Sequence, residues 1–142
     1  MQISWQGWAL LAAVFAAMTA LLAKIGVDEL APSYATLIRT IVILIVVAGI
    51  WGAAGAPYSN PFVSGKVIGA LVLSGVATGL SWLCYFQALK IGDASRVAPL
   101  DKLSVVLVAV FAVLFLGERL GPKGWLGVAM IAAGAILVSL KR

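Results

Sequence analysis

The feature that most constrains this chain is a series of long apolar runs, each close to the length that crosses a bilayer. We identify five of them, at residues 7–26, 33–51, 66–89, 95–116 and 124–140. A helix rises about 1.5 Å per residue, so about 20 residues cross a hydrocarbon core roughly 30 Å thick. Strands of a membrane barrel would be shorter and would alternate in polarity. The sequence therefore predicts an all-α integral membrane protein with five transmembrane helices, in a single domain of residues 1–142.

The overall composition agrees with lipid as the solvent. The chain is 63% hydrophobic and only 11% charged, whereas soluble domains carry about a quarter charged residues. A formal net charge of +5 could suggest nucleic acid. However, the Lys and Arg residues stand at the ends of apolar runs instead of forming a patch, so we expect the lipid bilayer, and no nucleic acid, as a partner.

Several kinds of chemistry lack the residues that they need. The chain has no histidine and a single cysteine, Cys84, which lies inside an apolar run and is interpreted as a small hydrophobe. Histidine proton relays, disulfide scaffolds and Cys/His zinc sites are therefore excluded. There is also no acid pair at catalytic spacing and no loop that could cradle a phosphate. We expect no metal, no cofactor and no enzyme activity.

Positive residues divide unequally between the two sides of the membrane. Five helices place the two termini on opposite sides, with three Lys and Arg residues on the N-terminal side and seven on the C-terminal side. Because positive residues favour the cytoplasm, we predict a plasma (inner) membrane protein with its N-terminus outside and its C-terminus cytoplasmic. If Lys24, Arg39 and Lys102 are counted as intramembrane, the count becomes four against three, which is compatible with dual topology.

Four charged residues fall within or near the ends of predicted spans. Lys24, Arg39, Asp101 and Lys102 all belong to the predicted cytoplasmic half. A charge at the bilayer centre costs about 2.5–3.5 kcal/mol or more. The two longer side chains could snorkel to the headgroups, and Asp101 could favour a helix N-terminus. The alternative is a charge cluster that gates a cavity or binds part of the solute, with Asp101 bridging a basic neighbour.

Polar and aromatic residues form a stripe in the third run. Thr78, Ser81, Trp82 and Tyr85 follow an i, i+3, i+4, i+7 spacing, which places them on one helix face. Such a face can line a substrate cavity through cation–π contacts and hydrogen bonds. The same spacing is equally compatible with helix packing in which the hydroxyls bond to backbone carbonyls.

The other possible functional group is the acid at the end of the fourth run. Glu118 precedes Arg119, and an exposed interfacial pair is the simpler interpretation. An embedded carboxylate could instead couple transport to protons.

Small residues recur at a spacing that permits close helix contact. Three glycine pairs lie four residues apart, namely Gly65 with Gly69, Gly75 with Gly79, and Gly117 with Gly121. This spacing lets helix backbones approach one another. It is compatible with packing inside one subunit or with a seam between two subunits.

The second half of the chain resembles a known family. Residues 82–90 (WLCYFQALK) and 92–104 (GDASRVAPLDKLS), followed by 116–120 (LGERL) and 124–127 (GWLG), are similar to the EamA domain of the drug/metabolite transporter superfamily. They resemble most its short bacterial and archaeal members, which have one five-helix unit. The resemblance covers essentially the whole chain.

The resemblance implies a transporter whose larger relatives fuse two such units around a substrate cavity. This chain would then work as a homodimer or with a second half-transporter, moving a small metabolite or drug-like solute by alternating access. The excess of positive charge favours an anionic or zwitterionic solute. The family's small multidrug relatives carry a glutamate in their first helix, and this chain has no acid at the corresponding place. The alternative function is a non-transporting accessory or structural membrane subunit.

Overall fold

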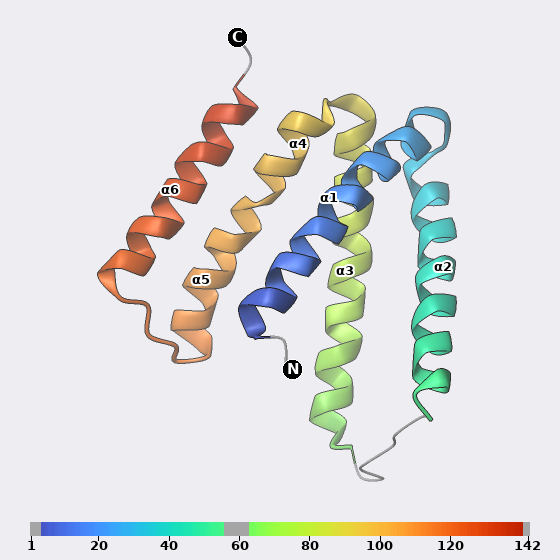
Figure 1. The fold of residues 1–142 in the computed structure, drawn as a ribbon, viewed down its shortest axis with the longest axis horizontal. Helices are drawn as coiled ribbons and strands as arrows, with labels where there is room; N and C mark the ends of the chain where they lie inside the picture. The colour runs from blue at the N-terminus through green and yellow to red at the C-terminus, as the bar shows by residue number, and fades with distance from the viewer. Residues whose placement is uncertain (1–3, 56–62, 141–142) are drawn as a thin grey trace. The chain divides into compact units, whose positions relative to one another are not determined.

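The computed structural model describes residues 4–55 and 63–140, and all of their regular secondary structure is helical. Six helices follow one another along the chain (Figure 1): α1 (Trp5–Glu29), α2 (Pro32–Ala53), α3 (Gly65–Ile91), α4 (Ala94–Asp101), α5 (Leu103–Phe115) and α6 (Pro122–Ser139). Together α4 and α5 form one stretch, so five stretches are long and apolar enough to cross a membrane. The predicted all-α membrane fold is confirmed.

The spans begin one or two residues before the predicted runs; the first three end two or three residues later than predicted, and the last two end one residue earlier. Two of them begin at proline, α2 at Pro32 and α6 at Pro122. Proline suits the first turn because its fixed φ is already helical and no hydrogen bond is asked of its nitrogen there. Lys141 and Arg142, which contributed to the predicted charge bias, lie outside the described residues.

The fourth run was predicted as one helix over 95–116, and the structure divides it. The division falls at Lys102, whose backbone N–H donates to the carbonyl of Pro99 at 3.0 Å, three residues back. Pro99 lies inside α4 and has no N–H to donate to the carbonyl of Ser95. The tighter turn after Pro99 separates α4 from α5.

The end of α5 is set by a glycine. Gly117 has φ +68°, in the left-handed region that side chains other than glycine rarely adopt. The Glu118 N–H then turns back to the carbonyl of Ala112 at 3.2 Å. This backbone reversal ends the helix and satisfies one of its last carbonyls. It gives a physical reason for the Leu-Gly-Glu sequence at this position.

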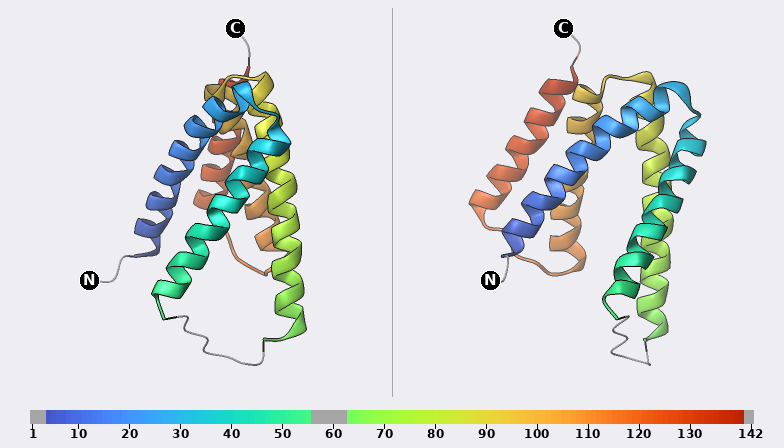
Figure 2. Two further views of the ribbon diagram at one scale, coloured as in Figure 1. Left: turned by 90° about the vertical axis from the view of Figure 1, so that its right-hand side faces the viewer. Right: turned by 45° about the vertical axis from the view of Figure 1, so that its right-hand side comes forward.

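The described chain forms two units. Of the described residues, 4–21 with 91–140 make one unit, in which α6 packs against α4 and α5. Residues 22–55 with 63–90 make the other unit, which contains the end of α1 together with α2 and α3. Within this second unit, α2 and α3 approach each other where α2 begins and α3 ends, and they diverge toward their other ends (Figure 2).

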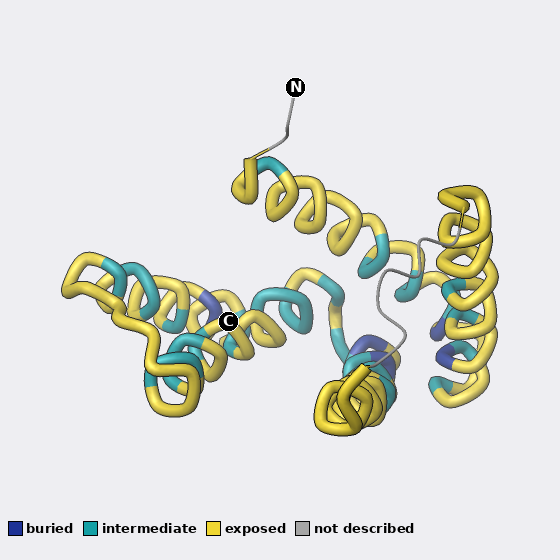
Figure 3. Tube along the Cα trace, turned by 90° about the horizontal axis from the view of Figure 1, so that it is seen from below, coloured by how far each residue is buried: buried dark blue, intermediate teal, exposed yellow. Residues whose placement is uncertain are grey.

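Few of the described residues are buried (Figure 3). In the second unit Val27, Phe86 and Leu89 are at most 2% exposed, and Thr36 is also buried. Large apolar side chains elsewhere on the helices are exposed, including Trp5, Phe15, Leu44 and Leu73. In water such a continuous apolar surface would be unstable, but lipid is as apolar as these side chains. The small core lies at the end where α1, α2 and α3 meet.

Candidate functional site

The most unusual polar group of the described chain is Arg39 of α2. Its guanidinium carbon lies 4.1 Å from the ring centroid of Trp82 and 5.5 Å from that of Phe86, both on α3. Tyr85 lies beside Phe86 on α3, with the two ring centroids 6.3 Å apart. We call Arg39, Trp82, Tyr85 and Phe86 the guanidinium site. The structure thus brings together one residue of the predicted charge cluster and two residues of the predicted aromatic stripe.

The guanidinium contacts α3 at a position beyond the first turn of α2. Arg39 follows the start of α2 by seven residues, or about 10 Å of helix. Trp82 precedes the end of α3 by nine residues, or about 14 Å. The guanidinium lies over the ring of Trp82, which belongs to the apolar stretch of α3. Snorkelling of Arg39 to the headgroups stays a prediction.

The prediction from sequence did not include Phe86. It stands four residues after Trp82, so both rings lie on neighbouring turns of one face. Its side chain is only 2% exposed and forms part of the small core. The i+4 spacing from Trp82 was the available signal, but Phe86 is apolar and was indistinguishable from the lipid-facing residues around it.

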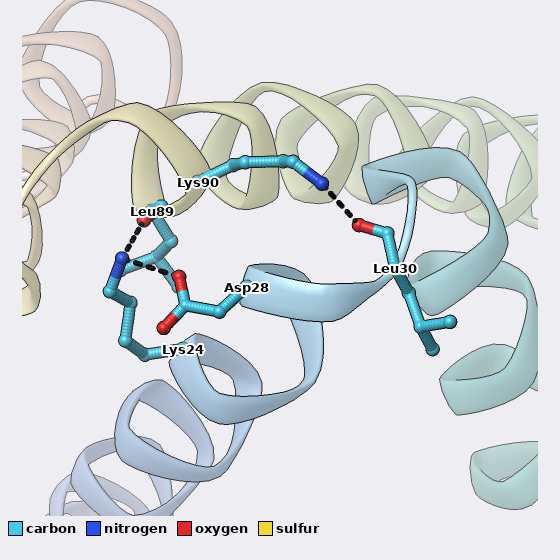
Figure 4. A network of polar contacts seen from close by, with 5 residues as sticks. All are labelled: Lys24, Asp28, Leu30, Leu89 and Lys90. Carbon is cyan, nitrogen blue, oxygen red and sulfur yellow. Dashed lines mark hydrogen bonds and ion pairs between the residues drawn. The ribbon is translucent and has the colours of Figure 1, made fainter.

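Two lysines tie α1 and α3 together at the same end of the unit (Figure 4). Lys24 of α1 donates from Nζ to the carbonyl of Leu89 at 2.8 Å and pairs with Asp28 Oδ1 at 2.7 Å. Lys90 of α3 donates to the carbonyl of Leu30, just beyond α1, at 2.8 Å. The last carbonyls of a helix lack intrahelical partners and carry partial negative charge. Each lysine therefore satisfies the C-terminal end of the other helix.

These bonds explain Lys24 without any solute. Its charge is balanced by Asp28, one turn later on α1, and a second hydrogen of its ammonium group is donated to a backbone carbonyl. Asp28 was not part of the predicted cluster, although its i+4 spacing from Lys24 is the ordinary spacing of helix ion pairs. Lys24 thus acts as a link between helices, which we distinguish from the guanidinium site.

The two hydroxyl residues of the predicted stripe behave differently from its aromatic residues. Thr78 donates to the carbonyl of Ser74 at 2.9 Å, and both Thr78 and Ser81 are exposed. Hydroxyls bonded to the preceding turn were the alternative to a cavity lining, and Thr78 takes that form. A cavity role for these two residues stays a prediction.

A separate apolar groove of about 550 Å³ lies between α2 and α3. The hydroxyls of Thr36 and Thr40 within it are bonded to backbone carbonyls one turn back, at 2.7 and 2.8 Å. Its α3 residues are displaced by two positions from the predicted stripe, which at about 100° per residue places them almost on the opposite face. The groove is lined by Ser33, Thr36, Leu37, Thr40, Val76, Gly79, Leu80 and Leu83.

The remaining predicted residues belong to the unit that contains α4, α5 and α6. Lys102 Nζ lies 3.4 Å from Asp101 Oδ2 at the division between α4 and α5, and both residues are exposed. Neighbours in a regular helix would point apart, so the division permits this contact. A bridge from Asp101 to Lys24 or Arg39 stays a prediction.

The predicted coupling residue lies outside the helices. Glu118 follows the C-terminal end of α5 and is exposed, which agrees with the simpler interpretation of an interfacial acid. No cluster of three or more acid, cysteine or histidine side chains that could hold a metal is present among residues 4–55 and 63–140.

Comparison with known proteins identifies the family. The model of the EamA-like transporter family matches residues 3–140. An uncharacterized transporter in the cobO 3′ region of a Sinorhizobium species is 59% identical over 140 residues, which cover 99% of each chain. The uncharacterized transporter YxxF of Bacillus subtilis is 30% identical over 136 residues, 95% of this chain and 42% of that protein.

A more distant relative carries a more specific name. A probable 4-amino-4-deoxy-L-arabinose-phosphoundecaprenol flippase subunit, ArnE of Yersinia pestis, is 36% identical over 69 residues, 49% of this chain and 60% of that protein. No solved structure matches the chain. Since the family model covers nearly the whole sequence and five helices are suited to crossing a membrane, the chain is a multi-pass membrane protein that belongs to the EamA-like transporter family.

Proposed function

We propose that this protein is a secondary transporter that moves a small solute across the membrane by alternating access, without enzyme activity of its own. Its family and its transporter-named relatives support this function. The observation that carries it is Arg39. Its charge lies in a membrane-spanning helix, where it has aromatic neighbours but no ion pair with the described residues. Intramembrane ionisable groups are rare and usually lie on solute pathways.

The alternative is an accessory or structural membrane subunit that transports nothing. In such a protein every polar side chain within the spans would be bonded internally. Lys24, Thr36, Thr40 and Thr78 fit that description because each is bonded to a backbone carbonyl. Arg39 does not fit, since its described contacts are with aromatic rings and none of the described ion pairs involves it. We therefore favour transport.

We propose a homodimer, or a pair with a second half-transporter, as the working form. The relative ArnE is named as a subunit, which supports an assembly of more than one chain. The glycines of α3 also support it, because an added methyl group at Gly65, Gly69 or Gly75 would meet no neighbouring atom within 4 Å. Such small, uncovered positions allow a second helix to approach closely. A cavity between two units is the arrangement that alternating access requires.

We further propose insertion in the inner membrane with the N-terminus outside. Lys24, Lys90 and Arg96 lie at the helix ends that this orientation assigns to the cytoplasm, which is the side that positive residues favour. The orientation makes the guanidinium site part of the cytoplasmic half of the protein.

Solute flux into proteoliposomes tests the proposed function. A panel of radiolabelled metabolites, both anionic and zwitterionic, would be offered to vesicles with wild-type protein, with Trp82→Ala and with Asp101→Asn. We expect saturable uptake of at least one solute by the wild type and reduced uptake by the Trp82 variant. Absence of uptake across the panel, in vesicles where the protein is folded and inserted in both orientations, would favour the accessory subunit.

A further inference from the structure

We propose that Arg39 is the residue that binds the solute, and that its guanidinium pairs with an oxyanion of the solute, either a carboxylate or a phosphate. This inference rests on the proposed transport function and narrows it to a class of solute. Two aromatic rings of α3 position the guanidinium, and we assign its N–H groups to the ligand.

The geometry of the guanidinium separates its two modes of contact. The group is planar, and its five N–H bonds point outward within that plane. A ring 4.1 Å away, that of Trp82, contributes attraction to the charge without using those hydrogens. None of the ion pairs among the described residues involves Arg39. A guanidinium without a carboxylate partner matches the two parallel acceptors of a carboxylate or phosphate.

The energies also leave room for an anion. A charged arginine inside a span raises the free energy of insertion into the membrane. A cation–π contact offsets less than that cost. The rings therefore offset part of the cost and leave the charge unneutralised. A bound oxyanion would supply the opposite charge and satisfy the donors together.

The acids of this chain are largely committed elsewhere. Asp28 pairs with Lys24 at 2.7 Å, Asp93 with Arg96 at 3.7 Å and Asp101 with Lys102 at 3.4 Å. The remaining two, Glu29 and Glu118, lie at or beyond helix ends. The positive charge of Arg39 is thus available to a ligand from outside the chain.

A cationic solute is disfavoured at the same place. Trp82 was predicted to bind a solute by cation–π contact, and its ring is the one on which the guanidinium rests. A second cation there would be repelled by Arg39 and would have to displace it. An oxyanion instead gains from the charge that the rings hold in place.

Binding can be measured on the purified full-length protein in an uncharged detergent, independently of transport. Benzoate would serve as the carboxylate probe, inorganic phosphate as the phosphate probe, and benzylammonium as the cation matched in size to benzoate. A series of mixed micelles with phosphatidylglycerol distinguishes a lipid headgroup from a soluble ligand. The readouts are thermal unfolding at increasing ligand, which gives Kd by mass action, and tryptophan emission.

The decisive comparison is Arg39→Gln with Arg119→Gln. Both remove one positive charge from the same residue type, but Arg119 lies outside the helices. We expect Arg39→Gln to weaken oxyanion binding at least about tenfold, as the loss of a charge-assisted hydrogen bond predicts. Arg119→Gln should stay within about twofold of the wild type. Arg39→Lys should be intermediate, because it keeps the charge and loses the planar fork.

Wild-type protein provides a test that does not depend on folding of the Arg39 variants. Oxyanion binding should change tryptophan emission, and Trp82→Phe should abolish that change while it keeps an aromatic ring under Arg39. Equal binding of benzylammonium and benzoate, or equal losses in the two Arg→Gln variants, would overturn the proposal. Binding restricted to phosphatidylglycerol would identify the oxyanion as a lipid headgroup and keep Arg39 as its receptor.

Failure of this proposal is distinguishable from failure of the proposed function. Solute flux that is the same in wild type and Arg39→Gln would leave transport standing and remove Arg39 as the receptor. Oxyanion binding that depends on Arg39, without flux of any tested solute, would leave the receptor and contradict transport.

Discussion

At the scale of single residues, Gly117 has a defined structural role, because its backbone conformation ends α5. Its φ of +68° lies where a side chain would meet its own carbonyl. No neighbour crowds the position, since an added Cβ would meet nothing within 4 Å. The requirement for glycine is therefore one of backbone conformation and not of space.

Replacing Gly117 with alanine should lower the free energy of unfolding by about 1 kcal/mol, the usual penalty of the left-handed region. The measurement is reversible unfolding in mixed micelles at increasing dodecyl sulfate. Gly127→Ala is the matched control, because Gly127 lies in α6 with open space around it and an ordinary helical φ. That control should be neutral or slightly stabilising. Equal effects of the two substitutions would contradict the role assigned to Gly117.

Between elements, the bonds made by Lys24 and Lys90 hold the end of α1 against the end of α3. Lys24 takes part in a hydrogen bond and an ion pair, whereas Lys90 makes a single described hydrogen bond. Hydrogen bonds that involve charged groups contribute about 1.5–3 kcal/mol when buried and less when exposed. The Lys24 side chain is 29% exposed and Asp28 is 51% exposed, so their ion pair is partly screened.

Lys24→Met should therefore destabilise the protein more than Lys90→Met, by about 1 kcal/mol or more. Both substitutions keep an unbranched apolar stem and remove the ammonium group. Unfolding of each variant in mixed micelles gives the comparison. A double-mutant cycle with Asp28→Asn isolates the ion pair from the bond to Leu89. A larger loss for Lys90→Met would show that the exposed bond matters more than the structure indicates.

The helices could be predicted from sequence much better than the contacts between them. A span is a local property, because about 20 apolar residues in a row suffice to identify it. The hydrogen bond from Lys24 to the carbonyl of Leu89 is not local in this sense, because the two residues are 65 positions apart. For the ion pair, two acids, Asp28 and Asp101, were available, and charge alone did not choose between them. Arg39 and Trp82 were each identified as unusual for lipid. Their contact depends on how α2 and α3 are rotated, which a uniformly apolar sequence does not encode.

The groove between α2 and α3 shows the same difficulty on a different face. Its residues are mostly aliphatic, with threonines whose hydroxyls are already bonded to the backbone. Nothing in their type distinguishes them from residues that face lipid. The polar stripe could be recognised from sequence because its residue types are rarer in membrane-spanning helices.

For the whole molecule, the central question is how the exposed helix faces are covered. If two copies associate through α3, Gly69→Leu and Gly75→Leu should lower the dimer fraction without changing the fold of one chain. The reason is that neither position has a neighbouring atom within 4 Å of an added Cβ, so only a second chain would meet the new side chain. Single-molecule photobleaching in liposomes at decreasing protein density measures the dimer fraction.

Gly69→Ala is the control for that experiment, because it keeps a small residue and should preserve the dimer. A dimer fraction that is the same in Gly69→Leu, Gly75→Leu and the wild type would exclude these glycines from the seam.

Orientation is the second property of the whole molecule that can be tested. With Cys84, the single cysteine of the chain, replaced by alanine, new cysteines at Ser4 and Lys90 would be labelled with a membrane-impermeant maleimide. The proposed orientation predicts labelling of Ser4→Cys in intact cells and of Lys90→Cys only after the membrane is opened. Labelling of both positions from outside, each in about half of the molecules, would support dual topology instead.

The missing N–H of Pro99 has a mechanical consequence for the fourth span. A continuous helix resists bending because backbone hydrogen bonds join each turn to the next. Here the hydrogen bond from residue 99 is absent, and the following turn is tighter at Lys102. The carbonyl of Ser95 lies in the first turn of α4, where water from the membrane surface can solvate it. Bending between α4 and α5 therefore breaks few backbone hydrogen bonds. As a consequence, α5 can tilt while α4 keeps its position.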